Sequence, residues 1–125
     1  MKVTRILHAT VNAQGDLQGT RRFYAEVLGL EPAERPEIPG LPGFFFAVGD
    51  AQVHIVGAPP TGEAIDPTGN HYCLAVDDIE AAAAELEAGG IRYVRGAQGP
   101  NDEVTQIWIV DPAGSTVELQ QDRPL

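Results

Sequence analysis

The order of the predicted elements occurs twice in this chain of 125 residues. Alternating or continuous apolar runs predict strands, and apolar residues at helical spacing predict helices. The first copy contains a strand, a helix and two further strands at residues 3–11, 17–28, 44–48 and 52–56. The second copy contains a strand, a helix and three strands at residues 71–76, 79–88, 91–95, 106–110 and 116–120. Such a repeat predicts two similar half-domains that fold against each other.

We therefore expect an α+β fold of one domain, residues 1–125, built from two βαβββ modules. The modules are residues 1–58 and 70–123, and a linker rich in proline, glycine and polar residues joins them at 59–69. Asp16 is predicted to cap the first helix, and Asp77 or Asp78 the second. Residues 31–43 carry four prolines and two glycines, which predicts a loop with at most one short edge strand.

Composition excludes several classes of protein. The net charge is −10, which argues against binding to nucleic acid or to an anionic membrane surface. No apolar run approaches the roughly 18–20 residues that span a bilayer, and the N-terminus does not read as a signal peptide. Cys73 is the only cysteine, so no internal disulfide forms. We expect a cytoplasmic protein, because a reducing compartment suits a chain of this kind.

The three histidines all fall within predicted strands, and so does Glu118. His8 and His54 lie 46 residues apart, in the first and last strands of the first copy. His71 and Glu118 lie 47 residues apart, in the equivalent strands of the second copy. Each of these positions alone could hold an ordinary hydrogen-bonded side chain. The symmetric placement of all four favours a metal site.

The alternation of side chains along a strand supports the same interpretation. His8, His54 and Glu118 each have apolar neighbours on both sides, so the neighbours can pack under the helices while the polar side chains face the opposite way. A carboxylate within an apolar strand is costly unless it is paired or bound to a cation. Histidine and carboxylate ligands together suit Zn, Ni, Co, Fe or Mn. The same alternation places five candidate pocket residues on the ligand face: Thr10, Gln52, Cys73, Thr116 and Gln120.

Several motifs give the chain a family resemblance. They are Ile6-Leu7-His8, Phe23-Tyr24-Ala25-Glu26-Val27-Leu28-Gly29-Leu30, Gly49-Asp50 with Val53-His54-Ile55, His71 with Val76-Asp77-Asp78, and Asp111-Pro112-Ala113-Gly114 with Val117-Glu118-Leu119. With these motifs the chain resembles the vicinal oxygen chelate superfamily, which includes glyoxalase I, bleomycin-binding proteins, methylmalonyl-CoA epimerase and extradiol dioxygenases. The resemblance implies curved mixed sheets around a metal cavity, with ligands at His8, His54, His71 and Glu118. It also implies a homodimer, with the modules paired either within one chain or across two.

One difference from glyoxalase I leaves the activity open. Glyoxalase I carries a metal-binding glutamate at the position where this chain has His54. Glu118 is then the only carboxylate, and we expect glyoxalase-type isomerase, epimerase or lyase chemistry on a small molecule bound through vicinal oxygens, with Glu118 as ligand and base. Extradiol dioxygenases of the superfamily hold iron with two histidines and one glutamate, so an Fe(II)-dependent dioxygenase is an alternative. A non-catalytic drug-binding protein is another, although such relatives lack the four ligands.

Overall fold

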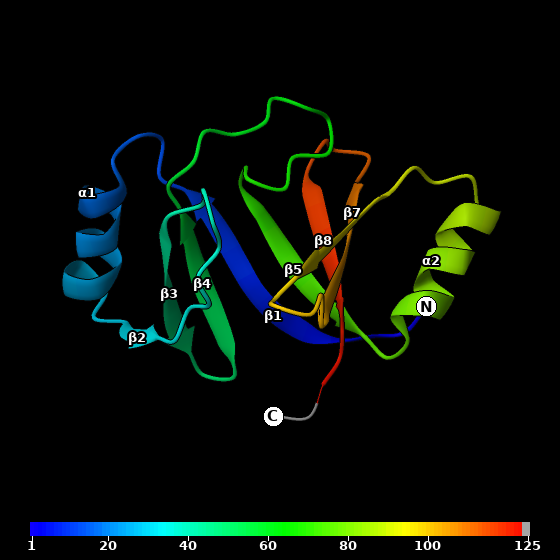
Figure 1. The fold of residues 1–125 in the computed structure, drawn as a ribbon, viewed down its shortest axis with the longest axis horizontal. Helices are drawn as coiled ribbons and strands as arrows, with labels where there is room; N and C mark the ends of the chain where they lie inside the picture. Colours follow the sequence, from blue (N-terminus) through cyan, green and yellow to red (C-terminus); the bar gives the residue numbers. More distant parts are fainter. Residues whose placement is uncertain (124–125) are drawn as a thin grey trace.

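A curved, mixed sheet of eight strands forms the body of the protein (Figure 1). The computed structural model describes residues 1–123. Along the sheet the strands follow the order β2-β3-β4-β1-β5-β8-β7-β6. Their bounds are β1 Val3–Asn12, β2 Glu31–Ala33, β3 Gly43–Val48, β4 Ala51–Val56, β5 His71–Val76, β6 Val94–Gln98, β7 Val104–Val110 and β8 Thr116–Gln121.

The sheet consists of two βαβββ modules, which confirms the predicted fold class. Within each module the first and last strands are parallel neighbours, β1 with β4 and β5 with β8, and the other pairs are antiparallel. The modules meet where β1 pairs antiparallel with β5, and Thr10 there lies opposite His71. The two modules therefore join within one chain in this structure, and the four strands that carry the predicted ligands are adjacent at the centre of the sheet.

Each module places its helix on the outer side of the sheet, at opposite ends of the molecule (Figure 1). The helix α2, Ile79–Ala88, packs its buried residues Ile79 and Leu86 against a core that includes Val117 and Leu119 of β8. In the first module, Leu17 and Tyr24 pack against Phe46 and Ile55. The apolar neighbours of Glu118 and His54 are thus on the helix side, as the alternation predicts. None of the helices within residues 1–123 has the length and apolarity needed to cross a membrane.

Two elements differ from the sequence prediction. The helix predicted over 17–28 is α1, Leu17–Arg22, followed by a π-helical turn, η1, Phe23–Val27, in which the Leu28 amide donates to the Phe23 carbonyl. The strand predicted over 91–95 is present but lies three residues later, as β6, Val94–Gln98. The amide of Ile91 still donates to the carbonyl of Leu86, so residues 91–93 close the end of α2 before the chain can enter the sheet.

Asp78, not Asp77, caps α2. Its carboxylate accepts hydrogen bonds from the amides of Glu80 and Ala81 at 3.1 and 3.0 Å. We expect Asp78→Ala to lower the free energy of unfolding by about 1 kcal/mol, since two amides lose their acceptor. Urea unfolding followed by circular dichroism measures this change. Asp77→Ala is the matched control and should stay within about 0.5 kcal/mol of wild type; equal losses in both variants would show that charge, not capping, is responsible.

Candidate metal centre

The pairing of the central strands brings the predicted ligands onto the concave face of the sheet. His8 on β1 is directly opposite Cys73 on β5, and Cys73 is opposite Glu118 on β8. Two residues further along β1, Thr10 lies between His54 on β4 and His71 on β5. Because residues in one row share a face, the two modules present their polar side chains toward a common point.

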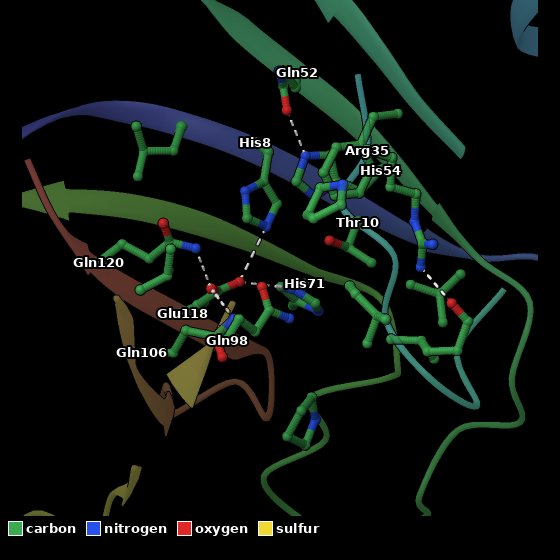
Figure 2. A pocket seen from close by; sticks show the side chains of 18 of the residues that line it. His8, Thr10, Arg35, Gln52, His54, His71, Gln98, Gln106, Glu118 and Gln120 are labelled. Carbon is green, nitrogen blue, oxygen red and sulfur yellow. Dashed lines mark hydrogen bonds and ion pairs between the residues drawn. The ribbon is translucent and has the colours of Figure 1, made fainter. Parts of the chain in front are cut away.

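Three of the predicted ligands converge at that point (Figure 2). The Nε2 atoms of His8 and His71 lie 3.0 and 3.2 Å from Oε1 of Glu118, and the donor atoms of all three residues lie within 4.8 Å of one another. Their side chains are at most 7% exposed. Adjacent ligands of an ion with bonds of about 2.1 Å are separated by roughly 3 Å, so the spacing of these atoms fits a shared cation.

The hydrogen bonding of His71 supports this fit. Its Nδ1 lies 2.8 Å from the carbonyl oxygen of Gly69, which only accepts, so Nδ1 carries a proton. In neutral His71 the Nε2 lone pair therefore faces the Glu118 carboxylate, and two electron-rich atoms would repel each other. Either a second proton on His71 or a metal ion is needed between them. A histidine whose Nδ1–H donates to a backbone carbonyl is the usual arrangement of a metal ligand.

Two glutamines hold the other carboxylate oxygen of Glu118. The side-chain amides of Gln106 and Gln120 donate to Oε2 at 3.0 and 2.6 Å. Burial alone would raise the pKa of Glu118, but hydrogen bonds from His71, His8 and Gln120 and the charge of His8 outweigh it and hold the pKa well below its usual range. Glu118 is thus kept ionised with its orientation fixed, and Oε1 is directed toward the two histidines.

His54, the fourth predicted ligand, lies beside this group without joining it. Its ring is stacked between Phe45, at 3.4 Å between centroids, and His8, at 3.9 Å. Its Nε2 lies 2.7 Å from Oε1 of Gln52 (Figure 2). Burial and the neighbouring His8 lower the pKa of His54 to about 2, so its imidazole is neutral. That His54 is a ligand stays a prediction.

A cavity of about 380 Å³ opens over the three converging side chains. Thr10, Gln52 and Gln120 line it, as the alternation predicts. Cys73 does not, because His8 and Glu118 occupy the neighbouring positions in its row and bury it completely; burial also raises the pKa of its thiol. Thr116 lies at a separate hollow near the loop of residues 57–70, where its hydroxyl accepts from the amide of Asp66.

Sequence reasoning missed several residues of the cavity wall. Trp108 lines the cavity and meets the His71 ring edge to face at 4.9 Å between centroids. Trp108 lies between Ile107 and Ile109 on β7, and Gln106 lies two residues before it on the same face, so the alternation of side chains could have found both. Arg35 and Gln98 also line the cavity, and neither had a signal in the sequence.

Comparison with known proteins identifies the family and agrees with this fold. Residues 5–119 match the Glyoxalase/Bleomycin resistance protein/Dioxygenase superfamily, and the chain belongs to that superfamily. It is 28% identical to "Glyoxylase I 4" of Arabidopsis thaliana, over 95% of this chain and 71% of that protein. It is 30% identical to the mitochondrial methylmalonyl-CoA epimerase of Mus musculus, over 96% of this chain and 74% of that protein. The crystal structure of methylmalonyl-CoA epimerase from Mycobacterium tuberculosis shares the fold, with a TM-score of 0.73, 20% identity and coverage of 98% and 90% of the two chains.

Proposed function

We propose that the protein is a metal-dependent enzyme of the glyoxalase type, which moves a proton within a small molecule chelated through vicinal oxygens. His8, His71 and Glu118 would hold one divalent ion, either Zn, Ni, Co, Fe or Mn. The observation that carries the proposal is the convergence of two histidine nitrogens on one carboxylate oxygen at 3.0 and 3.2 Å, with His71 already protonated at Nδ1. The similarity to a protein named glyoxylase and to an epimerase supports isomerase, epimerase or lyase chemistry.

The chain's own residues supply the rest of the chemistry. The bound ion would polarise a chelated carbonyl or diol of the substrate. Glu118 lines the cavity, and its carboxylate would accept the proton from carbon and return it. Gln106 and Gln120 fix its orientation, while Trp108 and Phe45 supply aromatic walls.

One observation favours a second candidate, an Fe(II)-dependent dioxygenase of the extradiol type. The three converging donors are two histidines and one carboxylate, which is the ligand set of many non-haem iron oxygenases. His54 is hydrogen-bonded to Gln52, so the donors that converge in this structure are His8, His71 and Glu118. In a dioxygenase reaction Glu118 would serve mainly as a metal ligand, whereas proton transfer also requires it to act as a base.

Metal-loaded protein assayed in parallel for both reactions tests the proposal. Protein loaded with Zn, Ni or Co should catalyse deuterium exchange from D₂O into small hydroxy ketones, followed by NMR, and Glu118→Gln should abolish the exchange. Uptake of oxygen with catechols by the Fe(II) form would replace the first candidate by the second. A wild-type protein that binds none of these ions would contradict both.

We also expect a homodimer in the cytoplasm, and light scattering of the purified protein tests the oligomeric state.

A further inference from the structure

Arg35 is a cation on the wall of the cavity, beside the candidate metal centre (Figure 2). It belongs to the segment between β2 and β3, and its guanidinium lies over the Phe45 ring at 5.6 Å from the centroid. The same ring stacks on His54, and His54 in turn stacks on His8. Two aromatic rings, Phe45 and His54, therefore lie between Arg35 and His8 in this stack.

The protein offers the guanidinium of Arg35 few hydrogen-bond acceptors. Nη2 donates to the carbonyl oxygen of Leu41, whereas Nε is buried and has no hydrogen-bond partner in the described chain. Among residues 1–123, Arg35 takes part in none of the ion pairs. A buried charged donor without a partner is unfavourable. Burial also lowers the pKa of Arg35, which reflects the same lack of compensation.

The other charged groups at the cavity are compensated or exposed. Arg5 pairs with Asp122 at 3.0 Å, Glu118 is bound by histidines and glutamines, and Asp50 is an exposed residue of the β3–β4 turn. The chain as a whole has a net charge of −10. A cation without a carboxylate partner in the cavity wall of such an acidic protein thus stands out as a specific feature.

The backbone is shaped to keep Arg35 in this place. Gly43, the first residue of β3, packs against the guanidinium, and a Cβ there would lie 3.3 Å from both Nε and Nη2. The same Cβ would collide with the carbonyl oxygen of Ile55. The glycine and the Phe45 ring together fix the orientation of a side chain that otherwise has many rotamers, so an incoming anion meets a preorganised group.

We propose that Arg35 binds a carboxylate of the substrate, so that the cavity takes a small organic acid with its vicinal oxygens at the metal centre and a distal carboxylate at Arg35. The proposal rests on the proposed function for the chelated end only. A volume of about 380 Å³ suits a small acid. The planar guanidinium is the group best matched to a carboxylate, and within residues 1–123 Arg35 has no carboxylate partner.

The test compares acids with analogues in which only the distal carboxylate is changed. The probes are 2-oxoglutarate and 2-oxoadipate, their distal amides, and the phosphonate analogue of 2-oxoglutarate. Trp108 is the only tryptophan and lines the cavity, so its fluorescence reports binding. The wild-type protein, Arg35→Met and the control Arg92→Met, which removes the same charge from an exposed position outside the cavity, are each titrated with and without Zn²⁺.

In wild type and Arg92→Met we expect at least one acid to bind about tenfold or more tightly than its amide, and in Arg35→Met we expect that preference to disappear. Should Arg35→Met not fold, Arg35→Gln serves the same comparison. A preference that survives loss of Arg35, with only the melting temperature lowered, would show that Arg35 merely supports the loop and would overturn the proposal. Tighter, Arg35-dependent binding of the phosphonate would overturn the assignment to a carboxylate. If the protein binds no metal, the titrations without Zn²⁺ still test Arg35 alone.

Discussion

Replacing His71 by alanine will remove the divalent ion that we expect the wild-type protein to hold. His71 contributes one of two nitrogen donors to the cluster, and its Nδ1–H bond to Gly69 fixes the ring with Nε2 toward Glu118. Changes to residues that merely orient a ligand weaken metal binding by 10–100-fold, so loss of a ligand should weaken it by more than about 100-fold. Metal content of tag-free protein purified without chelator, with competition against a Zn²⁺-binding dye, measures the loss.

The matched control for this prediction is Tyr72→Ala. Tyr72 is the next residue of β5, points to the other face of the sheet and is 39% exposed. It should retain the metal content of wild type. If His71→Ala and Tyr72→Ala bind the ion equally well, the cluster is not the metal site, and the contacts to Glu118 are hydrogen bonds of a protonated His71.

His54→Ala, measured beside them, decides how many ligands there are. In this structure His54 is engaged with Gln52 and stands outside the group of converging donors. A three-ligand site predicts that His54→Ala keeps the ion with less than about tenfold loss of affinity, whereas a loss as large as that of His71→Ala would mean that the His54 ring turns inward as the fourth ligand.

The sequence predicted the centre of the sheet better than its surroundings. His8, His71 and Glu118 come from strands that the repeat made recognisable, and the alternation of side chains fixed the face that each occupies. These are local properties of a strand. That β1 and β5 pair within one chain is not local, because the same edges could meet between two chains and the alternation of side chains along each strand would be the same in both arrangements.

The residues that the sequence did not reveal reach the site from elements without a periodic signal. Arg35 lies in a proline-rich segment, and its position depends on Phe45 and on the space that Gly43 leaves. His54 shows the converse: its strand and face were predicted, but the direction of its ring depends on the stack with Phe45 and on the amide of Gln52. Such side-chain rotamers depend on tertiary packing, and the alternation of residues along a strand does not predict them.

Acid will destabilise the metal-free protein, and His54 will account for a large part of the effect. The pKa of His54 is lowered from 6.5 to about 2 by burial and by the neighbouring His8. Between these values the unfolded chain binds a proton that the folded chain does not, so the free energy of unfolding falls as the pH falls below 6.5. The slope from one such group is about 1.4 kcal/mol per pH unit, or about 2 kcal/mol between pH 6.5 and about pH 5.

Urea unfolding of the protein in EDTA, at several values between pH 7.5 and about pH 5, measures this slope. Glu118, whose pKa is also lowered, contributes stability that is present above about pH 4.5 and is lost only at lower pH, so this window excludes it. We expect His54→Phe to keep the aromatic stack and to flatten the dependence by about 1 kcal/mol per pH unit or more.

Phe45→Leu is the control for the pH measurement, since it disturbs the stack but leaves the imidazole in place. It should lower stability at every pH while the slope stays that of the wild type. Equal slopes in wild type and His54→Phe would mean that His54 takes up its proton in the folded state, which requires its ring to leave the stack between Phe45 and His8. A histidine binds a metal ion only in its neutral form. The pH dependence of the free energy of unfolding therefore also tells whether His54 is neutral in the folded protein, as a fourth ligand would have to be.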